Sequence, residues 1–208
     1  GERIDVDPTE TWGSRDRSWG IRPVGERYGY GAPTGLPQFY WLWSPVNFEG
    51  FCLHFDVNED ADGHRWHEEA VFVPLDGPAE TRRAGYEVEW RPGTRRAGRF
   101  ELTLHDDTTG TAAVARFESL VTFQMLGIGY GHQDWSHGVW KGEAAVGGDR
   151  WALPVSDPVA PHHVHIQELC RVTLTLADGT EHVGTGILEQ FVIGEHRPTG
   201  LTGLFDGA

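Results

Sequence analysis

The residues best suited to chemistry lie in one short stretch of the chain, Tyr130 to Trp140. Its eleven residues include two histidines, one aspartate, one tyrosine and two tryptophans. Histidine, aspartate and tyrosine are side chains that transfer protons in enzyme sites. The candidates for acid–base catalysis in this stretch are Asp134, His132, His137 and Tyr130. A competing interpretation is structural: Asp134 caps a turn and Ser136 satisfies the backbone, as these residue types commonly do.

A related pattern occurs near the start of the chain. Residues 134–140, Asp-Trp-Ser-His-Gly-Val-Trp, align without gaps with residues 16–22, Asp-Arg-Ser-Trp-Gly-Ile-Arg, at an offset of 118 residues (134 − 16). This offset is too long for a solenoid repeat and is typical of two related lobes. Asp16 either lies buried among arginines beside a ligand cavity or belongs to a surface ion-pair cluster. The candidates for contact with a ligand are Trp19, Trp41, Trp43, Trp135, Trp140, Arg15 and Arg22.

The charges beside the two aspartates predict different roles for them. Arg15 and Arg17 flank Asp16 and would stabilise its anion. Asp134 has no adjacent arginine, and an apolar setting lined by tryptophan raises the pKa of a carboxyl group. We therefore expect Asp134, with His132 or His137, to supply the proton, while Asp16 supports it from a facing lobe. Trp19, Trp135 and Trp140 could stabilise a developing carbocation through cation–π attraction.

A second constellation, His162-His-Val-His165, is the strongest candidate for a metal site. His163 and His165 are two residues apart, so a strand would present both on one face, and Glu168 follows. Two imidazoles and a carboxylate can bind zinc or non-haem iron. The commoner explanation is a set of polar strand positions that face solvent or a partner. We expect no metal or other cofactor and keep His163, His165 and Glu168 as the alternative.

The overall composition excludes several classes of partner. The chain of 208 residues carries 17 basic and 31 acidic residues, a net charge of −14. A protein this acidic lacks the basic surface that binding to nucleic acid or to an anionic membrane requires. No apolar run is long enough to span a membrane. The two cysteines make no disulfide framework, which favours a cytoplasmic location with buried thiols and leaves a single structural disulfide as the alternative.

The pattern of the chain predicts an all-β fold with antiparallel strands in a barrel or sandwich. Alternation of apolar and polar residues is clear in segments 51–57, 86–91 and 100–105, and Asp-Gly and Pro-Gly turns separate such segments. Residues 3–7 also read as a strand, and residues 39–43 form an aromatic strand that is buried on both faces or faces a pocket. We expect residues 1–38 to contain a Gly- and Pro-rich connector and residues 39–208 to form the β domain. Helical periodicity is lacking.

These motifs together resemble a lipocalin-like family that includes hydroxyneurosporene synthase, kievitone hydratase and the AttH-type proteins. The resemblance rests on residues 15–22, 40–43 followed by Glu49-Gly50, 129–138 and 186–190. It implies two consecutive lipocalin-like β-barrel lobes in the whole family member. Family chains are commonly longer, so the resemblance predicts the end of a first lobe followed by a complete second lobe. The missing part would come from a longer chain or from a partner in a homodimer.

The resemblance also implies a function. It predicts a cofactor-independent pocket for a large hydrophobic molecule, such as a terpenoid or polyketide, which acid–base chemistry hydrates, isomerises or cyclises. The enzyme would then be a hydratase, a lyase or a cyclase. The sequence leaves two other functions open. One is a non-catalytic carrier of a hydrophobic ligand, and the other is a metal-dependent oxygenase that uses the histidines of residues 162–165.

Overall fold

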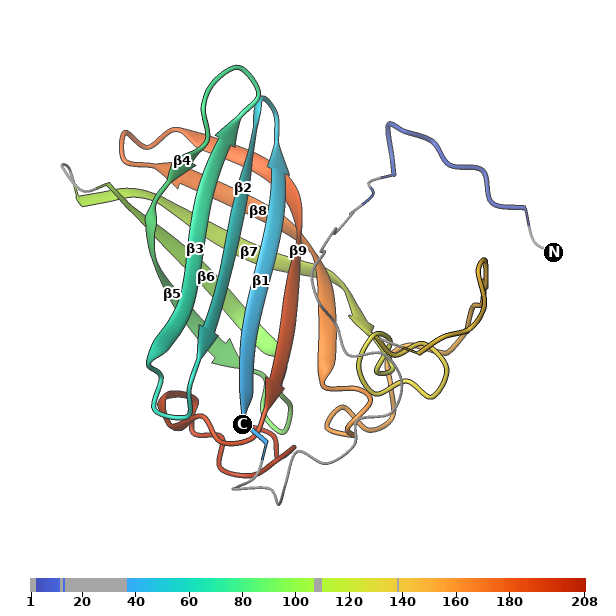
Figure 1. The fold of residues 1–208 in the computed structure, drawn as a ribbon. Coiled ribbons are helices and arrows are strands. Elements are labelled where there is room, and N and C mark those ends of the chain that lie inside the picture. The colour runs from blue at the N-terminus through green and yellow to red at the C-terminus, as the bar shows by residue number, and fades with distance from the viewer. Residues whose placement is uncertain (1–2, 12, 14–36, 107–109, 138) are drawn as a thin grey trace.

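The chain forms one antiparallel β-sheet that curves into a nearly closed barrel (Figure 1). The computed structural model describes residues 3–11, 13, 37–106, 110–137 and 139–208. The strands are β1 (Phe39–Phe48), β2 (Phe51–Glu59), β3 (Arg65–Pro74), β4 (Glu80–Thr81), β5 (Arg83–Trp90), β6 (Ala97–Asp106), β7 (Gly110–Gln124), β8 (His165–Leu176) and β9 (Glu181–Ile193). A short 3-10 helix, Arg197–Thr199, is the one helical element among the described residues. The predicted all-β antiparallel fold is confirmed, and the barrel is consistent with a lipocalin-like architecture.

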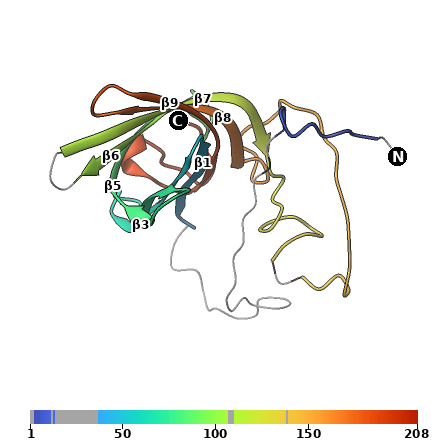
Figure 2. The same ribbon diagram turned by 90° about the horizontal axis from the view of Figure 1, so that it is seen from above.

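The first strand pairs with the last, and this pairing joins the two halves of the sheet. The strand order is β4-β3-β2-β1-β9-β8-β7-β6-β5, so β1 lies between β2 and β9. The two ends of the sheet meet along β3 and β5, where Arg82 N donates to Ala70 O at 2.8 Å and Arg65 Nη1 donates to Ala84 O at 2.8 Å. The view along the barrel shows this curved wall, with the loops of residues 125–164 lying outside it (Figure 2).

The strands separate an apolar inner face from a polar and aromatic outer face. On β2, Phe51, Leu53, Phe55 and Val57 point inward and are buried, as the alternation predicts. Equivalent positions on the other long strands join them in one hydrophobic cluster that fills the middle of the barrel. Hydrophobic burial of this kind is the main force that holds the sheet closed.

Two glycines on β9 allow β1 to approach closely. A Cβ atom at Gly186 would lie 2.7 Å from Pro45 O, and one at Gly184 would lie 2.4 Å from Asn47 O. Any other residue would push the two strands apart where the two halves of the sheet join.

A polar network at the lower end of the barrel surrounds Glu59. His196 Nε2 lies 3.0 Å from its Oε2, while Tyr86 donates to Oε1 at 2.8 Å and Arg65 Nε donates to Oε1 at 3.2 Å. Burial by itself would raise the pKa of Glu59, but the hydrogen bonds from His196, Tyr86 and Arg65 outweigh it and hold the pKa below its ordinary value. Burial also raises the pKa of Tyr86 far above its usual range. The buried carboxylate is thus stabilised by its partners.

Several sequence predictions are met differently in the structure. Residues 3–7 form no strand, so that prediction is wrong. Residues 110–124 form one strand, β7, that bulges between Ser119 and Val121. β1 begins at Phe39. Cys170 is buried inside the barrel and Cys52 is half-buried on its outer face. None of the described helices has the length and apolar character needed to cross a membrane.

Replacement of Glu59 by glutamine should destabilise the fold. It removes the charge that pairs with Arg65 and His196, and because Arg65 is partly exposed we expect a loss of about 2 kcal/mol near neutral pH. Since folding lowers the pKa of Glu59, its contribution is present above the unfolded-state pKa and is lost as the pH falls through the folded-state pKa. Urea unfolding at several pH values should show that the difference in unfolding free energy between the variant and the wild type becomes smaller in acid. Glu89→Gln, in an exposed pair with Arg99, is the matched control and should change little.

Candidate functional site

The candidate site lies on the outer face of the barrel, where aromatic and titratable side chains cross four neighbouring strands in register. Trp43 on β1 stands between Asp56 on β2 and Glu189 on β9. One step along, Trp41 stands between Asn58 and Phe191, and Phe191 is in turn paired with His165 on β8. We call this surface the outer-face site. Tyr40 and Leu42 on the same strand point into the core, so β1 faces both a packed interior and this surface.

His165 and Glu189 form the best-defined pair of the outer-face site. His165 Nε2 lies 2.9 Å from Glu189 Oε1, and Gln167 donates to the other oxygen of Glu189 at 3.1 Å. His165 is 5% exposed, and its Nδ1 is buried with no hydrogen-bond partner in the described part of the chain. Because a carboxylate only accepts, it favours the tautomer with hydrogen on Nε2 and a free lone pair on Nδ1. This is the arrangement of an imidazole oriented to accept a proton.

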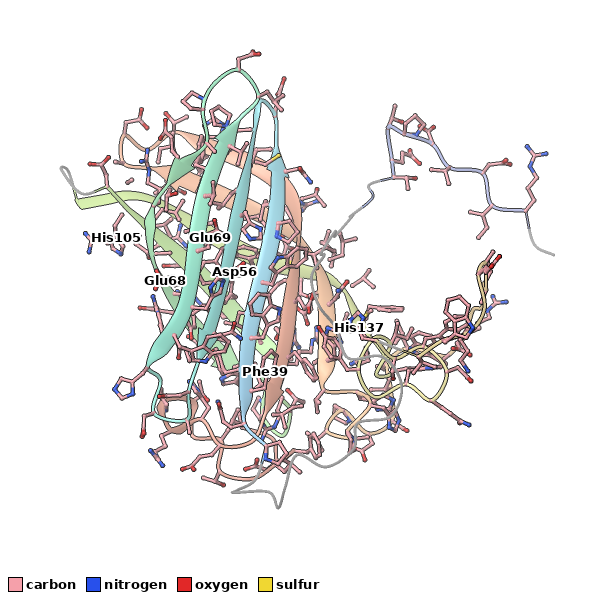
Figure 3. All side chains as sticks on the ribbon, viewed as in Figure 1. Phe39, Asp56, Glu68, Glu69, His105 and His137 are labelled. Carbon is pink, nitrogen blue, oxygen red and sulfur yellow. The ribbon has the colours of Figure 1, made fainter. Side chains whose placement is uncertain are left out.

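A loop brings Tyr130 against this pair. Met125 N donates to His165 O at 2.9 Å as the chain leaves β7, and Gly127 O then accepts from Tyr130, Gly131 and His132 in a tight turn. Gly127 has φ 73°, and a Cβ there would lie 3.0 Å from the backbone of Gly131 and of His132. The turn places the ring of Tyr130 5.3 Å from that of His165, 5.1 Å from Phe191 and 5.4 Å from His137. Figure 3 labels His137 in these loops, to one side of the barrel wall.

A pocket opens between this loop and the barrel wall. Its volume is about 360 Å³, within the range of small-molecule sites. The lining residues are Gly127, Tyr130, Gly131, Pro161, His162, His165, Phe191, Ile193 and Phe205. The walls are mainly aromatic and apolar, and imidazole and phenol groups supply the polar atoms. We call it the Tyr130 pocket.

Asp134 lies in a different environment from the one that the sequence suggested. Its side chain is 55% exposed, and Lys141 donates to its Oδ1 at 2.7 Å. This hydrogen bond and charge hold the pKa of Asp134 below its ordinary value, whereas a proton donor would need it raised. The expectation of a raised pKa is therefore wrong, because the stabilising cation lies seven residues along the chain.

His132 and Ser136 shape the loop. His132 Nδ1 accepts from the backbone N–H groups of Asp134 and Trp135, both at 3.0 Å, and its Nε2 lies 3.2 Å from Asp149 Oδ2. Ser136 Oγ donates to His132 O and lies 3.0 Å from Tyr130 O, so its backbone role is confirmed. These contacts hold Tyr130 and His137 in position.

The predicted aromatic residues lie in two groups. Trp41 and Trp43 are half-buried in the outer-face site. Trp135 is half-buried against Gly147 in the loops, and Trp140 is 74% exposed. The remaining predicted residues, Arg15, Asp16, Trp19 and Arg22, lie outside the described residues.

The alternative metal ligands do not come together. His163 Nδ1 lies 2.5 Å from Asp157 O, and His165 pairs with Glu189. Glu168 points to the inner face, where Arg96 and Thr122 donate to it. His165 and Glu168 are three residues apart on one strand, and residues with that spacing point to opposite faces.

Sequence reasoning missed three residues of the outer-face site, namely Glu189, His54 and Asp56. Glu189 belongs to the segment 186–190 that supported the family resemblance, but no role followed from it. His54 and Asp56 occupy the outward positions of the alternating strand β2. The available signal was the polar residue at every second position of the strand. The signal did not identify a site, because an outer face is polar whether or not it holds a particular pair of titratable groups.

Comparison with known proteins assigns a family but no activity. A family model described as "Family of unknown function (DUF8625)" matches residues 1–202. No curated protein and no solved structure matches the chain.

Two substitutions separate the roles of the loop residues. Asp134→Asn should leave the thermal unfolding midpoint within about 2 °C of the wild type, because the side chain is exposed and its ion pair is screened.

His132→Ala should raise amide hydrogen exchange in residues 127–137, since two backbone N–H groups lose their acceptor. Equal exchange in both variants would contradict this assignment.

Proposed function

The chain belongs to this family of unknown function, and we propose that it binds a large, mostly apolar small molecule in the Tyr130 pocket. His165 would exchange a proton with a polar group of that molecule. The single observation that carries the proposal is the state of His165. One of its ring nitrogens faces Glu189, the other is buried without a partner in the described part of the chain, and the residue lines an aromatic pocket.

The chemistry of the pocket supports this choice of ligand. A buried nitrogen without a hydrogen bond is costly, so a ligand hydroxyl that donates to Nδ1 would recover that energy. Tyr130 and Phe191 offer aromatic faces to an apolar body. Trp41 and Trp43 lie on the same outer wall but do not line this pocket. A terpenoid or a polyketide with a hydroxyl group has both features.

The proposed reaction class is hydration, isomerisation or cyclisation by acid–base transfer. In such a reaction His165 Nδ1 takes a proton from the ligand or from water and later returns it, while Glu189 stabilises the imidazolium that forms between the two steps. This needs no added cofactor. A carrier would use the same pocket without a proton-transfer step, and a cytoplasmic location is part of the proposal.

Binding of 2-naphthol and naphthalene tests the pocket directly. Both have the same apolar body, and 2-naphthol adds a hydroxyl that can donate to His165 Nδ1. We expect 2-naphthol to bind roughly 5- to 10-fold more tightly, as one hydrogen bond allows. His165→Gln should reduce that preference, and Tyr130→Ala should weaken binding of both compounds. Trp66→Ala removes an aromatic side chain that is 64% exposed outside the pocket and serves as control. Equal binding to Tyr130→Ala and to the wild type would refute the pocket assignment.

Turnover distinguishes an enzyme from a carrier. Purified protein is incubated with hydroxylated terpenoids, and the products are followed by mass spectrometry. If the protein is an enzyme, His165→Gln should lower the rate by roughly 10²- to 10⁴-fold, as expected for loss of a general acid–base group. If the wild type binds these compounds saturably but converts none of them, the protein is a carrier.

A further inference from the structure

A second cluster of titratable side chains lies on β2 and β3, apart from the Tyr130 pocket. His54 Nε2 lies 3.0 Å from Asp56 Oδ2, and Glu69 is the direct cross-strand partner of Asp56. His67 Nε2 lies 2.8 Å from the other oxygen of Asp56, Oδ1. Figure 3 labels Asp56 and Glu69 on these neighbouring strands. His54, Asp56 and Glu69 each offer one potential ligand atom, and these three atoms lie within 4.8 Å of one another.

Asp56 is the unusual member of this cluster. It is 6% exposed although it points to the outer face, and no arginine or lysine of the described residues pairs with it. Its Oδ1 is buried and accepts no hydrogen bond, even though His67 Nε2 is close. A buried carboxylate is costly unless charge and hydrogen bonds compensate it. The buried Oδ1 of Asp56 therefore has room for a cation as a partner, with the imidazole of His67 beside it.

We propose that His54, Asp56 and Glu69 bind a divalent first-row transition ion such as zinc, with His67 as a fourth group at the other oxygen of Asp56. Imidazole and carboxylate are the ligands that such ions take at about 2.0–2.2 Å. Ligand atoms around one ion are therefore no more than about 4.4 Å apart, so a small rotation of the exposed Glu69 completes the set. The remaining coordination positions would be open to water.

The surrounding residues hold these ligands in place. Trp43 contacts His54 edge to face at 5.9 Å, and Trp41 stacks on His67 at 6.3 Å. Both pairs of rings lie on regular strands, whose register sets the spacing of the ligands. Aromatic packing that orients the imidazoles reduces the entropy that metal binding would otherwise cost.

A second group of potential ligands, Asp60, Asp62 and His64, provides a contrast. These residues lie in the turn between β2 and β3, and His64 is 81% exposed at its side chain. Asp60 Oδ1 already accepts from the backbone of Asp62 and of His64 at 2.9 Å, so its role in the turn is satisfied. We assign no ion to this group and use it as a control.

Zinc titration of the chelator-treated full chain tests the proposal. We expect one zinc per chain by calorimetry, and Cu²⁺ should quench tryptophan fluorescence because Trp41 and Trp43 touch the imidazoles. Asp56→Asn keeps the shape of the side chain, and His54→Ala alters a partly exposed ring. Each should weaken zinc binding at least 30-fold, whereas His64→Ala and Cys52→Ser should not change it. Cys52 is included because it lies two positions from His54 on the same face.

The outcomes separate the explanations. A wild type that binds no zinc overturns the proposal and leaves Asp56 as a carboxylate paired with two histidines. Zinc binding that is lost in His64→Ala or Cys52→Ser moves the site elsewhere and also overturns it. Circular dichroism of each variant checks folding, and His54→Ala decides the question if Asp56→Asn does not fold. Because the 2-naphthol measurement uses different residues, either proposal can fail without the other.

Discussion

The pairing of β1 with β9 is the interaction on which the rest of the structure depends. It joins the first long strand to the last, closes the hydrophobic core and leaves only the β3–β5 edges to meet through Arg65 and Glu68. The same pairing sets Trp43 opposite Glu189 and Trp41 opposite Phe191. These residues are about 150 positions apart in the chain, so no local feature of the sequence brings them together. The outer-face site is therefore a product of barrel closure, as the core is.

Much of the fold could be predicted because it follows from local rules. The alternation in segment 51–57 specified which side chains of β2 enter the core, and the Asp62-Gly63 turn marked its hairpin with β3. Residues 3–7 alternate as well, yet they form no strand, because alternation stabilises a strand only when a neighbouring strand accepts its hydrogen bonds. β7 shows the converse case. A bulge between Ser119 and Val121 lets one strand continue through a break in the alternation.

The candidate site was predicted in fragments. Tyr130 and His137 belong to one motif and His165 to a rival one, and the structure places both histidines against the ring of Tyr130. The two motifs look like alternative sites in the sequence because a loop of irregular structure separates them. The sequence pattern does not specify the course of that loop. The pKa of Asp134 does not follow from its adjacent residues alone, because the loop returns Lys141 to it as a charge partner. The opposite directions of His165 and Glu168, in contrast, follow from strand periodicity alone.

The two clusters on the outer face share a wall, and this has an energetic consequence. Asp56 and Glu189 both pair with Trp43, so they lie two strand spacings apart, ~9.5 Å across the sheet. An ion held by His54 and Asp56 would restrict Trp43, and a ligand in the Tyr130 pocket would restrict Phe191, the neighbour of Trp41. Any effect of the ion on ligand affinity must then be matched by an equal effect of the ligand on ion affinity, since coupling free energies are reciprocal. With the middle of the barrel filled by side chains, this aromatic wall is the surface on which such coupling can occur.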